Sequence, residues 1–231
     1  MKNISALILA GGQSKRFGMD KGLFNYEGKL LITYLIDTLA FFDYPIFIGV
    51  NSNQQAQKYI DLIDITPITG ILIDDYEIIE NKELRSPLIG LYSALKELNT
   101  LNFEYAFILS CDNPFIQKSF IKYMIEKHSE FDGLVPIWKN QYVEPLLSIY
   151  KVRTFLDKCM VNLQQKDYKL SHLFDPNFNI NFISIEETIK IFDAKLSSFI
   201  NINDIKDLQD IKRKKWENFN FLILSRQETT N

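Results

Sequence analysis

Short apolar runs alternate along this chain with longer segments in which apolar residues recur at the spacing of one helix face. The short runs are rich in β-branched and aromatic residues and predict strands at Ile4–Ala10, Pro45–Val50, Ile71–Asp74, Tyr105–Ser110, Leu134–Ile137, Val143–Ile149 and Phe182–Ile185. The longer segments predict helices at Leu30–Leu39, Ala56–Ile63, Leu88–Leu98, Phe120–Lys127 and Val152–Leu163, and one more after Asp204. This alternation is typical of an α/β fold with a single, doubly wound, mostly parallel sheet that has helices on both faces.

The pattern supports one large domain over residues 1–211, because no internal repeat, low-complexity tract or linker rich in proline, glycine or serine interrupts it. Residues 212–231 are expected to form a C-terminal extension that is first basic and then apolar. Lys212–Lys215 supply the basic part, and Phe219–Leu224 supply the apolar part.

Composition and charge exclude several classes of protein. With 231 residues, of which 46% are hydrophobic, the chain can bury a sizeable core. Charges of both signs are mixed and sum to −3, so no overall basic field favours nucleic acid or an anionic membrane as a partner. No apolar run approaches the roughly 18 residues needed to cross a bilayer. Because Cys111 and Cys159 are too few for a disulfide framework, we expect a soluble, cytoplasmic protein.

The first predicted strand ends in a glycine-rich loop that also carries cations. Ligands gather beyond the carboxyl ends of strands in an open α/β sheet, so a binding site is expected here. Gly11 and Gly12 let the backbone approach a ligand closely, and Arg16 and Lys21 add positive charge that suits phosphate. Neither the Walker A pattern nor the dinucleotide fingerprint fits the spacing. Composition alone therefore leaves open a simple glycine turn with solvated charges.

The order of residues in this loop is more specific than its composition. It reads Leu9, Ala10, Gly11, Gly12, Gln13, Ser14, Lys15, Arg16, Phe17, Gly18, Met19, Asp20, Lys21. The string resembles the signature Leu-Ala-Gly-Gly-x-Ser-x-Arg-Met-Gly-x-Asp-Lys of the molybdenum cofactor guanylyltransferases, the MobA family of the nucleotidyltransferase superfamily. The resemblance continues through Gly28, Asn51, Asp75, Pro87–Leu91, Cys111–Phe115, Glu144–Leu146 and Asn201–Asn203. Departures occur at Phe17, Ser86, Ile89 and Asn113, where the family usually has Met, Gly, Ala and Met.

The resemblance implies a Rossmann-like nucleotidyltransferase fold over residues 1–211 and a defined reaction. The enzyme would transfer GMP from GTP to the phosphate of molybdenum-bound molybdopterin, forming the guanine dinucleotide cofactor and releasing pyrophosphate. Its partners would be GTP, molybdopterin and, further, molybdoenzyme apoproteins or other cofactor-biosynthesis proteins. The alternatives are a cytidylyl or sugar-phosphate nucleotidyltransferase, or a nucleotide-binding adaptor that delivers cofactor without chemistry. Gly11 argues against cytidylyl transfer, and retention of Arg16, Lys21 and Asp112 argues against the adaptor.

Asp112 follows a predicted strand and therefore lies at the same sheet edge as the glycine loop. A carboxylate there suits Mg²⁺, which typically takes one or two carboxylates and completes an octahedral shell with substrate phosphates and water. Taken alone, the segment suits a helix cap ahead of Pro114 equally well, and the resemblance favours the metal. It makes Arg16, Lys21 and Asp112 the catalytic residues, with Mg²⁺ as the cofactor on Asp112.

The same resemblance implies which residues hold the two substrates. The nucleotide site would comprise Leu9, Ala10, Gly11, Gly12, Lys21, Asn51, Asp75 and Asp112, and the pterin would contact Asn201 and Asn203. Asp75 would meet the guanine or ribose end, although paired aspartates also suit an ordinary strand exit. Asn51 also suits a plain turn, and Asn201 and Asn203 also suit a strand edge. Gly11 would lie beside the base, where an alanine methyl group would narrow the pocket against a purine.

Overall fold

The computed structural model describes residues 3–11, 18–81, 83–211 and 213. The predicted residues Gly12 and Arg16 lie outside these ranges, and so does almost all of the predicted C-terminal extension. Residues 205–211 are helical, which places a helix after Asp204 as expected.

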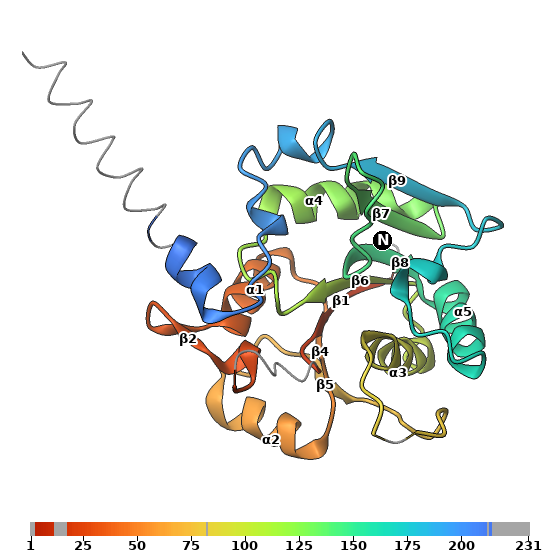
Figure 1. The fold of residues 1–231 in the computed structure, drawn as a ribbon, viewed down its shortest axis with the longest axis horizontal. Coiled ribbons are helices and arrows are strands. Elements are labelled where there is room, and N and C mark those ends of the chain that lie inside the picture. Colours follow the sequence, from red (N-terminus) through yellow and green to blue (C-terminus); the bar gives the residue numbers. More distant parts are fainter. Residues whose placement is uncertain (1–2, 12–17, 82, 212, 214–231) are drawn as a thin grey trace, which may run out of the picture.

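Seven strands in the described part of the chain form one central sheet (Figure 1). Their order across the sheet is β5 (Gly70–Ile73), β4 (Ile46–Val50), β1 (Ile4–Leu9), β6 (Tyr105–Ser110), β8 (Leu147–Lys151), β7 (Gly133–Ile137) and β9 (Ile180–Ser184). Neighbouring strands are parallel except around β8, which runs antiparallel to both β6 and β7. The expected mostly parallel sheet is therefore confirmed.

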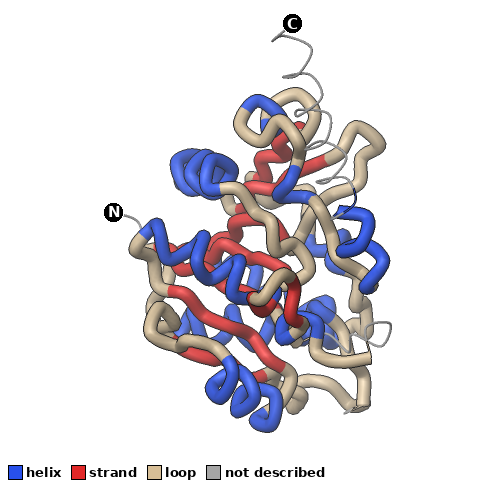
Figure 2. The backbone as a smooth tube through the Cα atoms, turned by 90° about the vertical axis from the view of Figure 1, so that its left-hand side faces the viewer, coloured by secondary structure: helices blue, strands red, loops and turns tan. Residues whose placement is uncertain are grey.

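Helices cover both faces of this sheet, which confirms the doubly wound arrangement (Figure 2). Side chains on β1 alternate between two cores, with Ile8 in one and Leu7 in the other. The core around Ile8 includes residues from one set of helices, α1 (Leu31–Leu39), α2 (Asn53–Leu62) and α4 (Lys118–Lys127). The core around Leu7 includes residues from α3 (Pro87–Thr100) and α5 (Val152–Gln164). None of the helices described is long and apolar enough to span a membrane.

Strand β8 begins later than predicted. The expected strand starts at Val143, but β8 starts at Leu147, and Val143 forms only an isolated antiparallel bridge with Ile137. Between them, the Leu147 amide donates to the Glu144 carbonyl, which closes a turn, and Pro145 has no amide hydrogen to donate to a ladder. The prediction was wrong at this end because the apolar pattern continues through a turn.

A short hairpin, β2 (Asn25–Tyr26) with β3 (Lys29–Leu30), was not predicted. Its strands are too short to show alternation, and its turn is formed by Glu27 and Gly28, which both have positive φ. Tyr26 of this hairpin packs with the fully buried Ile202 in a small third core. The hairpin therefore connects the region after the glycine loop to the late segment around Ile202.

Candidate active site

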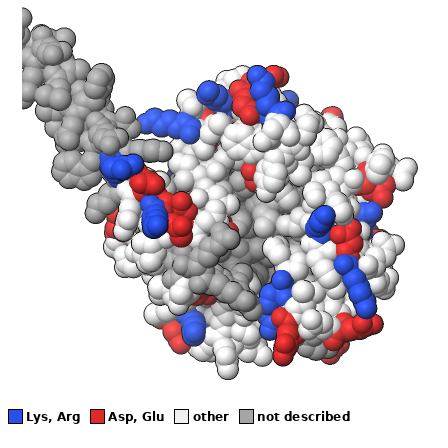
Figure 3. Space-filling model, in the orientation of Figure 1, with Lys and Arg blue, Asp and Glu red and all other residues white. Residues whose placement is uncertain are grey.

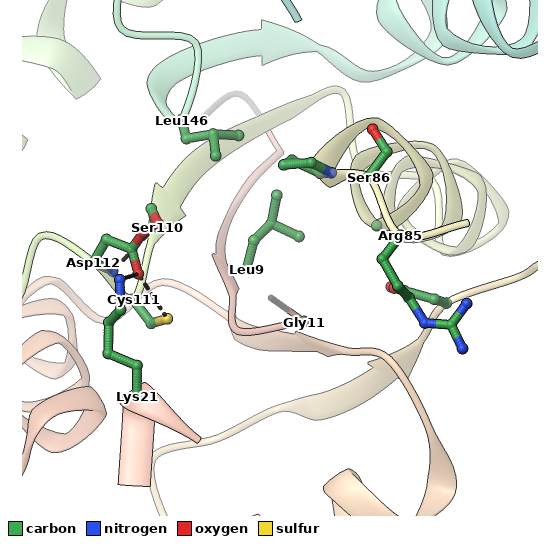
Figure 4. Close-up of a pocket in the computed structure, with 12 residues that line it drawn as sticks. Leu9, Gly11, Lys21, Arg85, Ser86, Ser110, Cys111, Asp112 and Leu146 are labelled. Carbon is green, nitrogen blue, oxygen red and sulfur yellow. Dashed lines mark hydrogen bonds and ion pairs between the residues drawn. The ribbon is translucent and has the colours of Figure 1, made fainter. Parts of the chain in front are cut away.

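A cavity of about 350 Å³ opens at the carboxyl edge of the sheet, where β1, β5 and β6 end beside the start of α3 (Figure 4). Strands β4 and β5 follow β1 on one side, while β6 lies on the other, so the chain reverses its direction of winding here. Ligands of doubly wound sheets bind at such a point. The lining residues are Leu9, Gly11, Lys21, Asp74, Arg85, Ser86, Pro87, Gly90, Ser110, Cys111, Asp112 and Leu146. Figure 3 shows acidic and basic side chains interspersed on this face of the molecule.

Lys21 and Asp112 form an ion pair in this cavity, with 2.8 Å between Lys21 Nζ and Asp112 Oδ1. Burial raises the pKa of the Cys111 thiol, so the thiol stays protonated and donates to the same oxygen at 3.6 Å. No donor among the described residues reaches Asp112 Oδ2. The lysine side chain is 8% exposed and the aspartate side chain 31% exposed. One carboxylate oxygen is thus held by the protein, and the other is available to a ligand.

The position of Lys21 is fixed by Asp20, which caps the 3-10 helix η1 (Lys21–Leu23) by accepting a hydrogen bond from the Gly22 amide. Two side chains of α2 hold the Asp20 carboxylate: Gln55 Nε2 donates to it at 2.6 Å, and the Tyr59 hydroxyl donates at 2.9 Å. A side chain at position 22 would collide with the Tyr59 hydroxyl, so glycine is required there. The sequence analysis missed these positioning residues.

The chemistry of Asp112 fits a magnesium ion whose other ligands are phosphate and water oxygens. Within the described ranges, no group of three or more His, Cys, Asp or Glu residues could hold a metal ion without a ligand. Mg²⁺ does not need such a group, since one carboxylate with phosphates and water suffices. The alternative interpretation, a helix cap, is excluded because α4 begins at Lys118 with Gln117 as its N-cap.

The two aspartates after β5 differ in their surroundings. Asp75 Oδ2 accepts from Lys96 Nζ of α3 at 2.8 Å and does not line the cavity. Asp74 lines the cavity, and burial raises its pKa to about 7, against the lowering effect of Tyr76 and Arg85. Leu72 and Asp74 share one side of the extended chain, and Leu72 packs against the core that contains α3. That alternation is the signal that could have identified Asp74.

The other predicted nucleotide residues divide into two groups. Leu9 and Gly11 line the cavity together with Lys21 and Asp112. Ala10 and Asn51 do not line the cavity but hold residues near it by hydrogen bonds. The Ala10 carbonyl accepts from Gln55 Nε2 at 2.9 Å, and Asn51 Nδ2 donates to the Gly11 carbonyl at 3.4 Å.

The late segment with Asn201 and Asn203 lies directly beside Asp112. The Ile202 amide donates to the Asp112 carbonyl oxygen at 2.8 Å, while both asparagines are exposed. The segment is not part of a strand, so the strand-edge alternative is excluded. The backbone of this segment is therefore bonded to that of Asp112, although neither Asn201 nor Asn203 lines the cavity.

Arg85 is a cavity residue that the sequence analysis did not identify. Its guanidinium carbon lies 4.5 Å from the centroid of the Tyr76 ring, and its Nη1 donates to the Leu84 carbonyl at 2.9 Å. Figure 4 shows Arg85 across the cavity from Lys21 and Asp112. Ser86 follows it and caps α3, since its hydroxyl accepts from the Leu88 amide.

Comparison with known proteins agrees with this geometry. Residues 6–177 match the MobA-like NTP transferase domain. A probable molybdenum cofactor guanylyltransferase of Pyrococcus horikoshii is 32% identical, with 91% of this chain and 100% of the relative covered. One from Methanosarcina mazei is 28% identical, with 90% of this chain and 89% of the relative covered.

Solved structures show the same fold. The molybdopterin-guanine dinucleotide biosynthesis protein A of Archaeoglobus fulgidus has a TM-score of 0.72 at 22% identity, with 92% of this chain and 99% of that chain covered. The resemblance inferred from the glycine loop is confirmed: this chain belongs to the MobA-like NTP transferase family and is a nucleotidyltransferase.

Proposed function

We propose that this enzyme transfers GMP from GTP to the phosphate of molybdenum-bound molybdopterin and releases pyrophosphate. Relatives named molybdenum cofactor guanylyltransferase support this choice among nucleotidyl transfers. The observation that carries the proposal is the cluster around Asp112, where the Lys21 ammonium and the segment of Asn201 and Asn203 both contact the same residue. A phosphate-binding cation and the expected acceptor residues are thereby adjacent.

The reaction needs little acid–base chemistry from the protein, because the attacking phosphate oxygen of molybdopterin is already anionic. Catalysis then depends on aligning this oxygen with the leaving pyrophosphate and on neutralising the charge that develops there. Lys21 supplies a positive charge that is fixed by Asp20 and α2. Because Gly11 has no side chain, the nucleotide can approach the backbone at the end of β1 closely.

Asp112 would hold a divalent metal, Mg²⁺ in our proposal, since the contacts that the described residues Lys21 and Cys111 make with its carboxylate both involve Oδ1. When bound, the metal would supply positive charge that neutralises the charge developing on the leaving pyrophosphate. Lys21 is ion-paired with the Asp112 carboxylate, so its ammonium lies beside the position where the phosphates would meet the metal.

The acceptor binds, in this proposal, on the side of Asp112 formed by Asn201 and Asn203, with Arg16 and Gly12 completing the triphosphate site from outside the described ranges. The enzyme works in the cytoplasm and passes its product to molybdoenzyme apoproteins or other cofactor-biosynthesis proteins. Residues 212–231 remain a separate extension that the reaction does not require.

The test is identification of the product. We expect purified enzyme with Mg²⁺, GTP and molybdenum-bound molybdopterin to yield one pyrophosphate for each product whose mass exceeds the acceptor by one GMP unit less water. Asp112→Asn serves as the inactive control. A product formed only from CTP would contradict guanylyl transfer, and GTP binding without pyrophosphate release would indicate a delivery adaptor instead.

A further inference from the structure

Gln55 of α2 is a buried polar residue, and its side-chain amide uses all of its groups. The residue is 8% exposed. Its Nε2 donates to the Ala10 carbonyl at 2.9 Å and to Asp20 Oδ2 at 2.6 Å, and its Oε1 accepts from the Asn51 amide at 2.8 Å. Turning the amide over would place its oxygen against two acceptors, so these partners fix its orientation.

The three partners belong to separate parts of the chain that meet at the edge of the cavity. Ala10 directly follows β1, and Asn51 directly follows β4. Asp20 directly precedes Lys21, at the far end of the glycine-rich loop that begins after β1. One side chain therefore ties the two ends of this loop to each other and to the end of a neighbouring strand.

Tyr59, one turn further along α2, bonds the same carboxylate as Gln55. It is fully buried, and burial raises the pKa of its hydroxyl, which stays protonated and donates to Asp20 Oδ1 at 2.9 Å. The same oxygen accepts from the Gly22 amide at 3.0 Å. The backbone on both sides of Lys21 is thus held by this network, which directs the lysine side chain into the cavity.

The contacts of Gln55 differ from those of a glutamine that only serves α2. Gln57, on the exposed face of the same helix, donates to Asp61 Oδ1 of that helix at 2.8 Å. Gln55 instead bonds residues 35 and 45 positions away, both at the ends of the loop. A leucine at this position would be buried without needing polar partners, whereas a buried amide has to find them. The glutamine is therefore better explained by the loop that it holds than by the packing of the helix.

We propose that Gln55 is a positioning residue for the triphosphate: it sets the place of the Lys21 ammonium relative to the end of β1. The inference rests on the proposed function, which places the phosphates at Lys21. Gln55 does not touch the substrate and acts through Ala10 and Asp20. A loop whose ends are already held at the spacing needed for binding loses less conformational freedom when the nucleotide arrives, and the affinity is higher for that reason.

The test compares the wild type with Gln55→Met, which keeps an unbranched side chain of similar size and removes all three hydrogen bonds. Calorimetry measures the binding of GTP and of inorganic tripolyphosphate, a probe that has no base. We expect both affinities to fall by about tenfold or more, since hydrogen bonds to charged groups are worth this much. The KM for GTP should rise similarly, while the KM for molybdopterin stays unchanged. A purely structural defect would instead lower the active fraction and leave both KM values as they are.

Three further variants sharpen the result. Gln57→Met, the same substitution on the exposed face of α2, should bind both probes like the wild type. Tyr59→Phe removes one of the bonds to Asp20 and should weaken both probes less than Gln55→Met. In the presence of Lys21→Ala, Gln55→Met should have little further effect, because it acts through the lysine that is already lost. Far-UV circular dichroism and thermal unfolding check that each variant is folded, and Tyr59→Phe serves as the test if Gln55→Met is not.

The possible failures are distinguishable. Unchanged tripolyphosphate binding by folded Lys21→Ala overturns the placement of the phosphates in the proposed function. A loss of binding in Lys21→Ala, with wild-type binding in folded Gln55→Met, overturns only the inference. Equal losses from Gln55→Met with and without Lys21→Ala also overturn it, because Gln55 would then not act through the lysine.

Discussion

The carboxylates at the two ends of the cavity, Asp112 and Asp74, differ in whether the protein supplies a cation to pair with them. At one end, Asp112 is partly exposed and its charge is compensated by Lys21 at 2.8 Å. At the other end, Asp74 is half-buried without an ion-pair partner in the described residues, and desolvation raises its pKa to about 7. At the first end the protein itself supplies the compensating charge, whereas at the second the carboxyl group has one hydrogen-bond donor among the described residues, the Tyr76 hydroxyl. Substitution of each aspartate should therefore have a different main readout: activity for Asp112 and pH-dependent stability for Asp74.

The largest effect is expected for Asp112→Asn, which keeps the size of the side chain and removes the charge that, in the proposed function, holds the metal. We expect kcat to fall by about 100-fold or more, the range seen when a group that stabilises transition-state charge is lost. The measurement is the rate of pyrophosphate release over a Mg²⁺ titration. A variant with nearly wild-type turnover at ordinary Mg²⁺ would remove Asp112 from the metal site.

Lys21→Ala should weaken GTP binding by roughly 10-fold to 100-fold, since charge-assisted hydrogen bonds are worth about 1.5 to 3 kcal/mol. Transfer should also slow, and Arg16→Ala should have the same two effects. Because the Asp112 side chain is 31% exposed and can be hydrated, we expect only a small loss of thermal stability for Lys21→Ala. Large destabilisation with intact catalysis would instead indicate a purely structural ion pair.

The pH dependence of the free energy of unfolding tests the surroundings of Asp74, at the other end of the cavity. The pKa of Asp74 is about 7 in the folded protein, above the ordinary value of about 3.9 expected when unfolded. Between these values the folded state binds more protons, so the contribution of Asp74 to stability falls as pH rises from about 4 to about 7. Tyr76, which contacts Asp74 and whose pKa is raised to about 12, does not titrate in this window.

We therefore expect Asp74→Asn to gain stability relative to the wild type across that window. Urea unfolding of both proteins at pH 5 and pH 8 measures it. If the free energy of unfolding changed by the same amount between pH 5 and pH 8 in both proteins, Asp74 would not be the group whose ionisation lowers the stability of the wild type.

The smallest effect is expected for Gly11→Ala. The sequence analysis placed the added methyl group in the base pocket, but the structure places it against Asp74 Oδ2 at 3.3 Å and the Asn51 amide at 3.5 Å. The methyl group would displace Asp74 slightly, so kcat/KM for GTP should fall by about tenfold, at the low end of one-methylene discrimination. Relative use of CTP should rise. An unchanged ratio of GTP to CTP kcat/KM would contradict the expectation that Gly11 lies beside the base.

The parts of the fold that were predicted well share a physical cause. Strands such as β1 and β6 are covered on both faces, so they appear in sequence as continuous apolar runs with clear ends. The beginning of β8 was misplaced because the apolar pattern runs through the turn at Pro145, and the β2–β3 hairpin is too short to have a pattern. In both places the hydrophobic pattern alone does not show where a turn interrupts the strands.

The site shows a similar limit. Lys21 and Asp112 could be found because each follows from a motif or a strand end. Choosing between Asp74 and Asp75 depends on a one-residue register that places the side chain on one face or the other. Gln55 was missed because α2 buries this polar residue, which holds Asp20 and Ala10, while the apolar Ile60 is exposed. Gln55 is buried because it bonds residues 35 or more positions away in the sequence, and a local pattern does not show such contacts.

The most direct test of the proposed function is the anomalous diffraction map of crystals containing a non-hydrolysable GTP analogue and Mn²⁺. We expect one manganese peak beside Asp112 and the phosphates of the analogue beside Lys21. A manganese peak away from Asp112 while the analogue is bound would contradict the assignment of Asp112 to the metal.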